Sequence, residues 1–245
     1  MVLAAIPARW GATRFPGKPL ASILGRPMIA WVVDAARSAT RVDDVAVVTD
    51  HPEIARAAEA AGARAVVSGA PADSGTDRIG HLLAMDPVAA QARIIVNVQG
   101  DEPLLEPEAI DAAVRLLDED LDSDPATEIA TLVRPLRSGE RADDPHLVKV
   151  AVAGDGRALS FSRDPIPHGA PRIHIGLYAY RRTAFDRFVE VAPSPLERLE
   201  RLEQLRALDL GIVVRCVEFD SRSIAVDRPE DLTRVEAVLE ELAGP

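Results

Sequence analysis

The sequence contains a single cysteine, and its basic residues are outnumbered by acidic ones. Each of these two scarcities excludes a class of protein. Cys216 has no partner for a disulfide bond, so nothing indicates an oxidising compartment, and we expect a thiol buried in the apolar run IVVRCVEF. The net charge of −11 argues against nucleic acid as a partner, because phosphate backbones are bound through basic surfaces. With 245 residues, 47% of them hydrophobic, the chain is long enough to bury a sizeable α/β core.

Long hydrophobic runs are also missing. No apolar stretch approaches the roughly 20 residues that a membrane span requires. The opening residues MVLAAI are too few for a signal peptide, and Pro7 and Arg9 follow at once. The sequence therefore predicts a cytoplasmic protein that does not associate with a membrane.

Lysine is nearly absent as well. The chain has 26 arginines but only two lysines, Lys18 and Lys149. Such a bias suggests a GC-rich genome. It also draws attention to the two lysines that were kept.

Strand-like and helix-like segments alternate through the first half of the chain. Short apolar runs predict strands at 2–6, 44–49, 63–67 and 93–98. Amphipathic spacing predicts helices at 26–39, 51–62, 76–85 and 106–120. This alternation predicts a mostly parallel, doubly wound sheet with helices on both sides.

The pattern changes after about residue 122. Strand-like pieces occur at 129–136, 147–154, 158–163 and 174–182, with turns such as AGDG that favour antiparallel pairing. The remaining segments predict helices at 183–191, 194–210 and 229–242 and a strand at 212–219. In the helix at 194–210, leucines recur every three residues, which suits core packing or a contact with a partner chain. We therefore expect one α/β domain with an antiparallel insertion in its second half.

A basic loop follows the first predicted strand, where doubly wound sheets bind ligands. Its cations Arg9, Arg14 and Lys18 suit a polyphosphate, and Gly11 and Gly17 let the backbone approach a ligand. The spacing matches neither a Walker loop nor a dinucleotide fingerprint. The alternative is a basic loop that pairs with surface acids.

Two acidic segments also follow predicted strands. VNVQGDEPLL places Asp101, and IAVDRPEDL places Asp227, where the chain leaves a strand. Two carboxylates opposite a polyphosphate loop suit a Mg²⁺ ion. Alternatively, Asp101 forms a turn and DRPED only caps a helix.

Two further motifs allow both a structural and a functional interpretation. In SGTDR, Ser74 and Thr76 are candidate helix caps, and the backbone amides there suit a base or a phosphate. His174 alternates with apolar residues on a predicted strand. It is therefore either a packed core side chain or a site residue.

Taken together, these segments resemble the 3-deoxy-manno-octulosonate (Kdo) cytidylyltransferases. The motifs occur in the family's order and cover nearly the whole chain: PARWGATRFPGKPL, SGTDR, VNVQGDEP, SFSRDPIP, HIGLYAYRR, SPLERLERLEQLR and VDRPEDL. The resemblance implies a Rossmann-like nucleotidyltransferase fold, a homodimer, CTP and Mg²⁺. It also implies transfer of CMP to an anionic acceptor with release of pyrophosphate.

The resemblance assigns roles by position. The catalytic residues would be Lys18, Arg9, Asp101 and Asp227, and the last two would bind Mg²⁺. The nucleotide would contact Pro7, Ala8, Arg9, Gly11, Thr13, Arg14, Lys18, Ser74, Gly75, Arg78, Gln99 and Gly100. The acceptor would contact Gln99, Arg163, His174, Tyr178 and Glu203, and Arg228, where the family has a threonine, would add a further cation on the acceptor side. Residues 1–122 would form the nucleotide-binding half, 123–215 an acceptor and dimerisation insertion, and 216–245 the closing strand, metal aspartate and last helix.

Two departures from the family pattern lie on the acceptor side. The connection at 168–173 is short, and Ser223-Ile224-Ala225 and Arg228 replace the family's Gly-Thr-Gly and threonine. The acceptor is therefore either Kdo or a smaller phosphonate such as phosphonoformate. A CMP-sialate-type synthetase and an inactive nucleotide-binding regulator are two further hypotheses. The presence of Lys18 and of both aspartates favours an enzyme.

Overall fold

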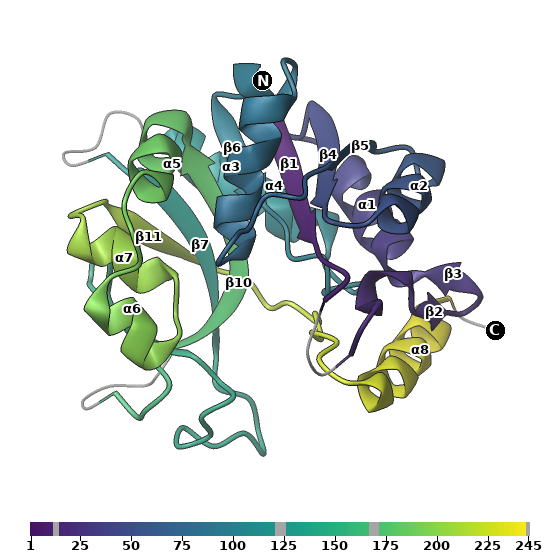
Figure 1. Cartoon of the computed structure of the whole chain (residues 1–245). Coiled ribbons are helices and arrows are strands. Elements are labelled where there is room, and N and C mark those ends of the chain that lie inside the picture. Colours follow the sequence, from purple (N-terminus) through teal and green to yellow (C-terminus); the bar gives the residue numbers. More distant parts are fainter. Residues whose placement is uncertain (12–14, 121–125, 167–171, 244–245) are drawn as a thin grey trace. The chain divides into compact units, whose positions relative to one another are not determined.

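The computed structural model describes residues 1–11, 15–120, 126–166 and 172–243 and divides into two compact units (Figure 1). The first unit comprises Met1–Asp111 and Arg222–Pro245, and the second comprises Ala112–Ser221. Parallel strand pairs dominate the first unit and antiparallel pairs the second. The predicted α/β fold, mostly parallel with antiparallel strands in the second half, is confirmed.

The elements of the first unit include every strand and helix predicted for it, each within a few residues of its predicted bounds. They are β1 (Val2–Ala8), the 3₁₀ turn η1 (Lys18–Leu20), β2 (Ser22–Ile23), β3 (Arg26–Pro27), α1 (Met28–Ser38), β4 (Asp44–Thr49), α2 (Pro52–Ala60), β5 (Arg64–Val67), α3 (Gly75–Met85), η2 (Ala89–Gln91), β6 (Ile94–Asn97) and α8 (Pro229–Ala243). α4 (Pro107–Glu119) begins in this unit and continues into the second. The short β2–β3 hairpin was not predicted, because two-residue strands carry no periodic signal.

The order of the parallel strands creates a switch point next to β1. The strands lie in the order β6-β1-β4-β5, so the chain runs outward from β1 to β5 and then crosses back to β6. Because such crossovers are right-handed, the helices before and after the reversal lie on opposite faces of the sheet. The carboxyl ends of β1 and β6 therefore flank the crevice in which this kind of sheet binds ligands.

Apolar packing holds the C-terminal segment in the first unit. Ile23, Met28, Leu104, Val226 and Val235 form one buried cluster, against which side chains from α1 and α8 also pack. Val226 is fully buried although it lies in a segment without regular structure. This burial fixes the position of the next residue, Asp227.

The second unit is built on two long strands, β7 and β10. Its elements are β7 (Ile129–Pro135), β8 (Lys149–Val152), β9 (Ala158–Ser162), β10 (Arg172–Arg181), α5 (Arg182–Val189), α6 (Pro195–Glu200), α7 (Gln204–Asp209) and β11 (Val214–Glu218). β7 pairs with β11 in parallel and with β10 antiparallel, and β8 pairs antiparallel with both β10 and β9. The strands and α5 lie within three residues of their predicted bounds.

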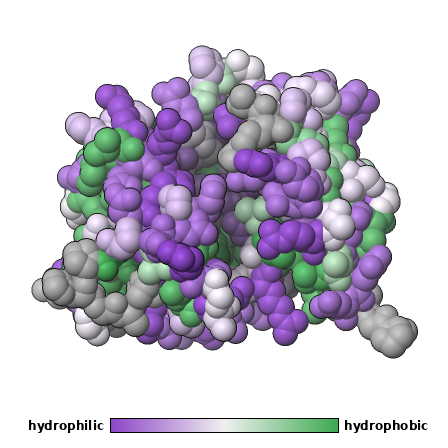
Figure 2. Space-filling model, turned by 90° about the horizontal axis from the view of Figure 1, so that it is seen from below, coloured by the Kyte–Doolittle hydropathy of each residue, from purple (hydrophilic) through white to green (hydrophobic). Residues whose placement is uncertain are grey.

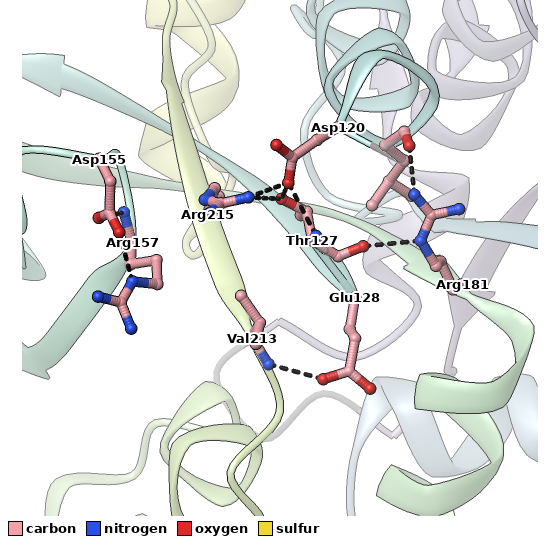
Figure 3. A network of polar contacts seen from close by, with 9 residues as sticks. Asp120, Thr127, Glu128, Asp155, Arg157, Arg181, Val213 and Arg215 are labelled. Carbon is pink, nitrogen blue, oxygen red and sulfur yellow. Dashed lines mark hydrogen bonds and ion pairs between the residues drawn. The ribbon is translucent and has the colours of Figure 1, made fainter. Parts of the chain in front are cut away.

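A polar network links the ends of β7, β10 and β11 (Figure 3). Arg215 on β11 contacts Asp120, which also accepts hydrogen bonds from the backbone and hydroxyl of Thr127. Arg181 on β10 donates to the Thr127 carbonyl (2.7 Å), and Glu128 accepts from the Val213 amide (2.9 Å). These contacts fix the start of β7 between its two neighbouring strands.

The single helix predicted at 194–210 is wrong. The structure has two short helices, α6 and α7, because Arg201 adopts the left-handed conformation (φ 57°) at the end of α6. Leu202 and Leu205 are buried, whereas Leu199 is 79% exposed. The three-residue leucine spacing therefore does not mark one continuous buried stripe.

Composition also predicts that no segment spans a membrane and that the thiol of Cys216 is buried. In the described part of the chain, no helix is both long enough and apolar enough to cross a bilayer. The face seen in Figure 2 is mainly hydrophilic, with smaller hydrophobic patches. Cys216 is half-buried on β11 rather than fully buried, and desolvation raises the pKa of its thiol to about 12.

Candidate active site

The site segments of the first unit meet where β1 ends. A Cβ atom on Gly100 would lie 2.8 Å from the Pro7 carbonyl oxygen, and one on Gly75 would lie 3.2 Å from the Pro7 ring. The missing side chains at these two glycines let the segment after β6 and the start of α3 approach the opening strand. The structure thus brings the predicted segments around 7, 75 and 100 together.

Lys18 is the centre of this arrangement. Its ammonium donates to Asp101 Oδ2 (2.6 Å) and to the Val226 carbonyl (2.8 Å). The nearest carboxylate oxygen of Asp227 is 4.0 Å from the same nitrogen. The side chain of Lys18 is only 13% exposed, whereas those of Asp101 and Asp227 are 31% and 54% exposed. One cation therefore lies between two carboxylates that remain accessible to solvent.

The backbone places the two carboxylates side by side. The Val226 amide donates to the Asp101 carbonyl (2.9 Å), which links the two segments directly. Asp231 accepts hydrogen bonds from the amides of Asp227 and Arg228 (2.9 Å each). The capping expected in DRPED is thus performed by Asp231, while the carboxylate of Asp227 faces Lys18.

Glu102 adds a third carboxyl group next to this pair. Its Oε2 accepts a hydrogen bond from the Ser223 hydroxyl (2.8 Å). Burial, together with the neighbouring charge of Asp101, raises the pKa of Glu102 to about 7. Ser223, one of the residues that departs from the family pattern, therefore has a partner in the first unit.

The start of α3 combines a cap with a buried polar chain. Ser74 Oγ accepts from the Asp77 amide (3.1 Å), so the predicted cap role of Ser74 is confirmed. Thr76 is buried and accepts from Asn97 Nδ2 (3.1 Å) instead of capping the helix. Gln99 in turn donates to Asn97 Oδ1 (3.2 Å). This chain of contacts sets the position of Gln99 relative to α3.

The end of β4 holds the opening loop. The Trp10 amide donates to Asp50 Oδ1 (2.8 Å), and the Trp10 ring stacks on His51 with the ring centres 4.1 Å apart. Arg78 on α3 lies 3.7 Å from the other carboxylate oxygen of Asp50. Arg78 is buried, and among the described residues its Nη1 has no hydrogen-bond partner. That guanidinium donor is therefore buried without a partner in this part of the structure.

Four predicted acceptor residues lie in the second unit. Arg163 donates to the backbone carbonyls of Glu200 (3.2 Å) and Pro145 (3.0 Å). Glu203 is the residue before α7, and Tyr178 is buried at a bulge of β10.

His174 is held in one tautomer on β10. Thr131 donates its hydroxyl proton to the Leu177 carbonyl (2.8 Å), so we assign it as the acceptor from His174 Nε2 (2.9 Å). The ring also contacts Phe161 and Tyr178. Desolvation lowers the pKa of His174 to about 3, so the ring is neutral at neutral pH.

The remaining predicted residues in loops are either exposed or outside the described part of the chain. Arg9, Gly11 and Arg228 are exposed, and Arg228 lies 3.9 Å from Glu230 on α8. Thr13, Arg14 and residues 168–171 lie outside the described residues. Asp50 and His51 were not predicted, although two polar residues directly after a buried strand were a usable signal.

The arrangement suits a hard cation and a polyanion. Within the described residues, no group of three or more metal-binding side chains occurs. Two carboxylates and a backbone carbonyl nevertheless converge on the Lys18 ammonium, and these are the donor types that Mg²⁺ prefers when a phosphate completes its shell. The residues present therefore fit a magnesium ion bound together with a phosphate group.

Comparisons with known proteins agree on one family. The family described as cytidylyltransferase matches residues 3–215. A 3-deoxy-manno-octulosonate cytidylyltransferase of Anaeromyxobacter sp. (strain Fw109-5) is 47% identical over 247 residues, covering 98% of this chain and 96% of that protein. The Myxococcus xanthus (strain DK1622) protein of the same name is 43% identical, with 99% and 98% covered. A solved CMP:2-keto-3-deoxy-manno-octonic acid synthetase complexed with CTP has a TM-score of 0.88 and 36% identity, covering 97% of this chain and 98% of that one.

A parallel sheet with a basic loop and two carboxylates at its switch point defines an enzyme of the nucleotidyltransferase class, with a Rossmann-like fold. Within that class, the chain belongs to the cytidylyltransferase family. The resemblance to the Kdo cytidylyltransferases is confirmed over nearly the full length of the chain.

Proposed function

We propose that this enzyme transfers CMP from CTP to Kdo and releases pyrophosphate. The observation that carries the proposal is the Lys18 ammonium, held between Asp101 and Asp227 at the switch point of the sheet. Support also comes from relatives named Kdo cytidylyltransferases that cover nearly all of the chain. A solved relative that is complexed with CTP supports CTP as the nucleotide.

The first unit would hold the nucleotide. Arg9, Arg14 and Lys18 would bind the triphosphate, because guanidinium and ammonium groups match phosphate oxygens. The triphosphate would also contact the backbone of the same loop, at Pro7, Ala8, Gly11 and Thr13. It would contact the backbone of Gly100 as well, which lies against Pro7. The cytidine side would be formed by Ser74, Gly75, Arg78 and Gln99, and the Nη1 donor of Arg78 has no partner among the described residues.

Asp101 and Asp227 would hold a magnesium ion together with the phosphates of CTP. Bound there, Mg²⁺ would supply charge neutralisation at the α-phosphate and would favour the deprotonated acceptor. The chain itself supplies no covalent chemistry in this scheme. Its residues position CTP and the acceptor in line and neutralise the leaving pyrophosphate.

On the acceptor side, we assign Gln99, Arg163, His174, Tyr178, Glu203 and Arg228 to binding of the sugar acid. Because His174 is neutral at neutral pH, it would act there as a hydrogen-bonding group and not as a cation. Kdo is favoured over phosphonoformate because the relatives named above are Kdo enzymes, and the comparisons lend the phosphonate no support.

Pyrophosphate release tests the proposal. The full chain is incubated with CTP and Mg²⁺, and with either Kdo or phosphonoformate as acceptor. Release with Kdo is expected. If only phosphonoformate supports release, then phosphonoformate and not Kdo is the acceptor. If the chain binds CTP but releases pyrophosphate with neither acceptor, it is a nucleotide-binding protein and not this enzyme.

A variant pair tests the assigned carboxylate. Asp227→Asn is expected to lower kcat about 100-fold, because it removes a carboxylate that would hold the magnesium ion at the reacting phosphate. Glu240→Gln removes an equal charge at an exposed position further along α8 and should leave kcat unchanged. Equal effects in the two variants would contradict the assignment.

We also propose that the enzyme is a homodimer. In the second unit, Leu159 is 61% exposed and Leu199 is 79% exposed, which supplies apolar surface for a second copy. Light scattering after gel filtration should give about twice the chain mass of 26.3 kDa. A monomer at micromolar concentration would contradict this proposal.

A further inference from the structure

The ammonium of Lys18 lies among oxygen atoms of the kinds that also bind metal ions. Its three nearest oxygen partners come from three different residues: a carboxylate of Asp101, the carbonyl of Val226 and a carboxylate of Asp227. These oxygens belong to segments more than 80 residues from Lys18 in sequence. The chain has therefore assembled a cation site and filled it with its own side chain.

A lysine and a divalent ion compete for such a site. Both need the same carboxylate oxygens, and their positive charges repel each other when they are close. We propose that Lys18 is the resident counter-cation of Asp101 and Asp227 in the nucleotide-free enzyme, and that it keeps divalent metal out until a triphosphate draws its ammonium away. This inference rests on the proposed function, because the triphosphate is the anion that would attract the lysine.

The side chain can move while the backbone around it stays in place. The Gly17 amide donates to the Trp10 carbonyl (2.9 Å), and the Ala21 amide donates to the Lys18 carbonyl (2.9 Å). The Met28 amide donates to the Ala21 carbonyl (2.8 Å). The four-carbon stem of lysine, in contrast, reorients by rotation about single bonds. The exchange therefore needs a change of rotamer and no rearrangement of the sheet.

The consequence is coupled binding. Without nucleotide, a divalent ion must displace a paired ammonium, so its affinity is low. With the ammonium on the triphosphate, the carboxylates are open and the affinity rises. Because such coupling is reciprocal, metal binding should tighten CTP binding by the same factor.

Manganese binding without nucleotide tests the inference. Free Mn²⁺ is titrated into the full chain and into Lys18→Met, with electron paramagnetic resonance as the readout. Lys18→Met should bind Mn²⁺ about tenfold more tightly than the wild type. Arg26→Met, which removes a cation paired with Asp34 elsewhere in this unit, should match the wild type. The double variant Lys18→Met with Asp227→Asn should lose the gain, and equal affinities in wild type and Lys18→Met would overturn the inference.

A second measurement uses the wild type, so it does not depend on how the variant folds. With ¹³C-labelled lysine, only Lys18 and Lys149 give side-chain signals. CTP without metal should shift the Lys18 signal and leave that of Lys149 in place. A Lys18 signal that stays fixed while CTP binds would overturn the inference and leave the proposed function intact. Absence of any CTP binding would instead contradict the proposed function.

Discussion

The ion pair between Glu197 and Arg206 requires the break in the helix predicted at 194–210. In one continuous helix, residues nine apart lie about 13.5 Å apart along the axis and on opposite sides. In the structure, Arg206 donates to both carboxylate oxygens of Glu197, at 2.6 and 2.8 Å. This contact is possible only because Arg201 ends α6 in the left-handed conformation and α7 begins separately at Gln204.

The pair is buried, which sets the magnitude of its effect. The side chains of Arg206 and Glu197 are 1% and 8% exposed. Arg206 also donates to the Val191 carbonyl (3.1 Å) and lies over the Phe188 ring (4.4 Å). Removing one partner of a buried pair leaves an uncompensated charge and costs about 3–5 kcal/mol. For a chain of this length, about 2–4 °C is lost per kcal/mol, so Tm should fall by about 6–20 °C.

The assay is a double-mutant cycle on the full chain. Arg206→Met, Glu197→Gln and the double variant are unfolded with urea and by heat while circular dichroism is recorded. Because the second substitution removes a charge that is already unpaired, the double variant should lose less stability than the two single variants combined, by about 1–3 kcal/mol. Arg182→Met, which breaks a more exposed pair with Asp186, should cost less than about 1 kcal/mol. Additive losses, or equal losses in Arg206→Met and Arg182→Met, would refute the reasoning.

Three other predictions follow from the second unit. Arg201→Gly should stabilise the protein by about 1 kcal/mol in urea unfolding, since glycine adopts a positive φ without strain; destabilisation would mean that the helix is continuous. His174, with its pKa lowered to about 3, stays neutral in the folded state while the unfolded chain takes up a proton below about pH 6.5. Stability should therefore fall as pH drops from 6.5 toward 3, by at most about 1.4 kcal/mol per pH unit, and less steeply in His174→Gln; parallel pH profiles would contradict this. Lys149→Met should lower the free energy of unfolding in urea by at least about 1–3 kcal/mol, because it removes a buried ammonium that donates to three backbone carbonyl groups. An unchanged unfolding midpoint would contradict that role.

Local patterns predicted the strands because each strand carries its own signal. The residues of β1 and β4 are almost all apolar and buried, and an apolar run of that length is visible without knowledge of any contact. The break at Arg201 carries no such signal. It depends on a contact between two charged residues that sequence spacing alone would place on opposite sides of a helix.

The same distinction between local signals and long-range contacts applies to the candidate site. The motifs around Lys18, Asp101 and Asp227 were visible because each follows or precedes a predicted element. The position of the Lys18 ammonium was not, since it depends on the Val226 amide bonding to the Asp101 carbonyl and on the buried packing of Val226. Such contacts over long sequence separations are fixed by the assembled sheet and not by any single segment.

The presence of lysine has a physical explanation at both positions where it occurs. A guanidinium is planar and matches a planar carboxylate, as Arg206 does with Glu197. An ammonium is compact, and its three N–H bonds diverge, so it suits three oxygens that approach from different directions. Lys149 meets the carbonyls of Asp144, Leu147 and Arg163, and Lys18 meets Asp101, Val226 and Asp227. In a chain that uses arginine almost everywhere else, lysine thus remains where three oxygens converge on one point.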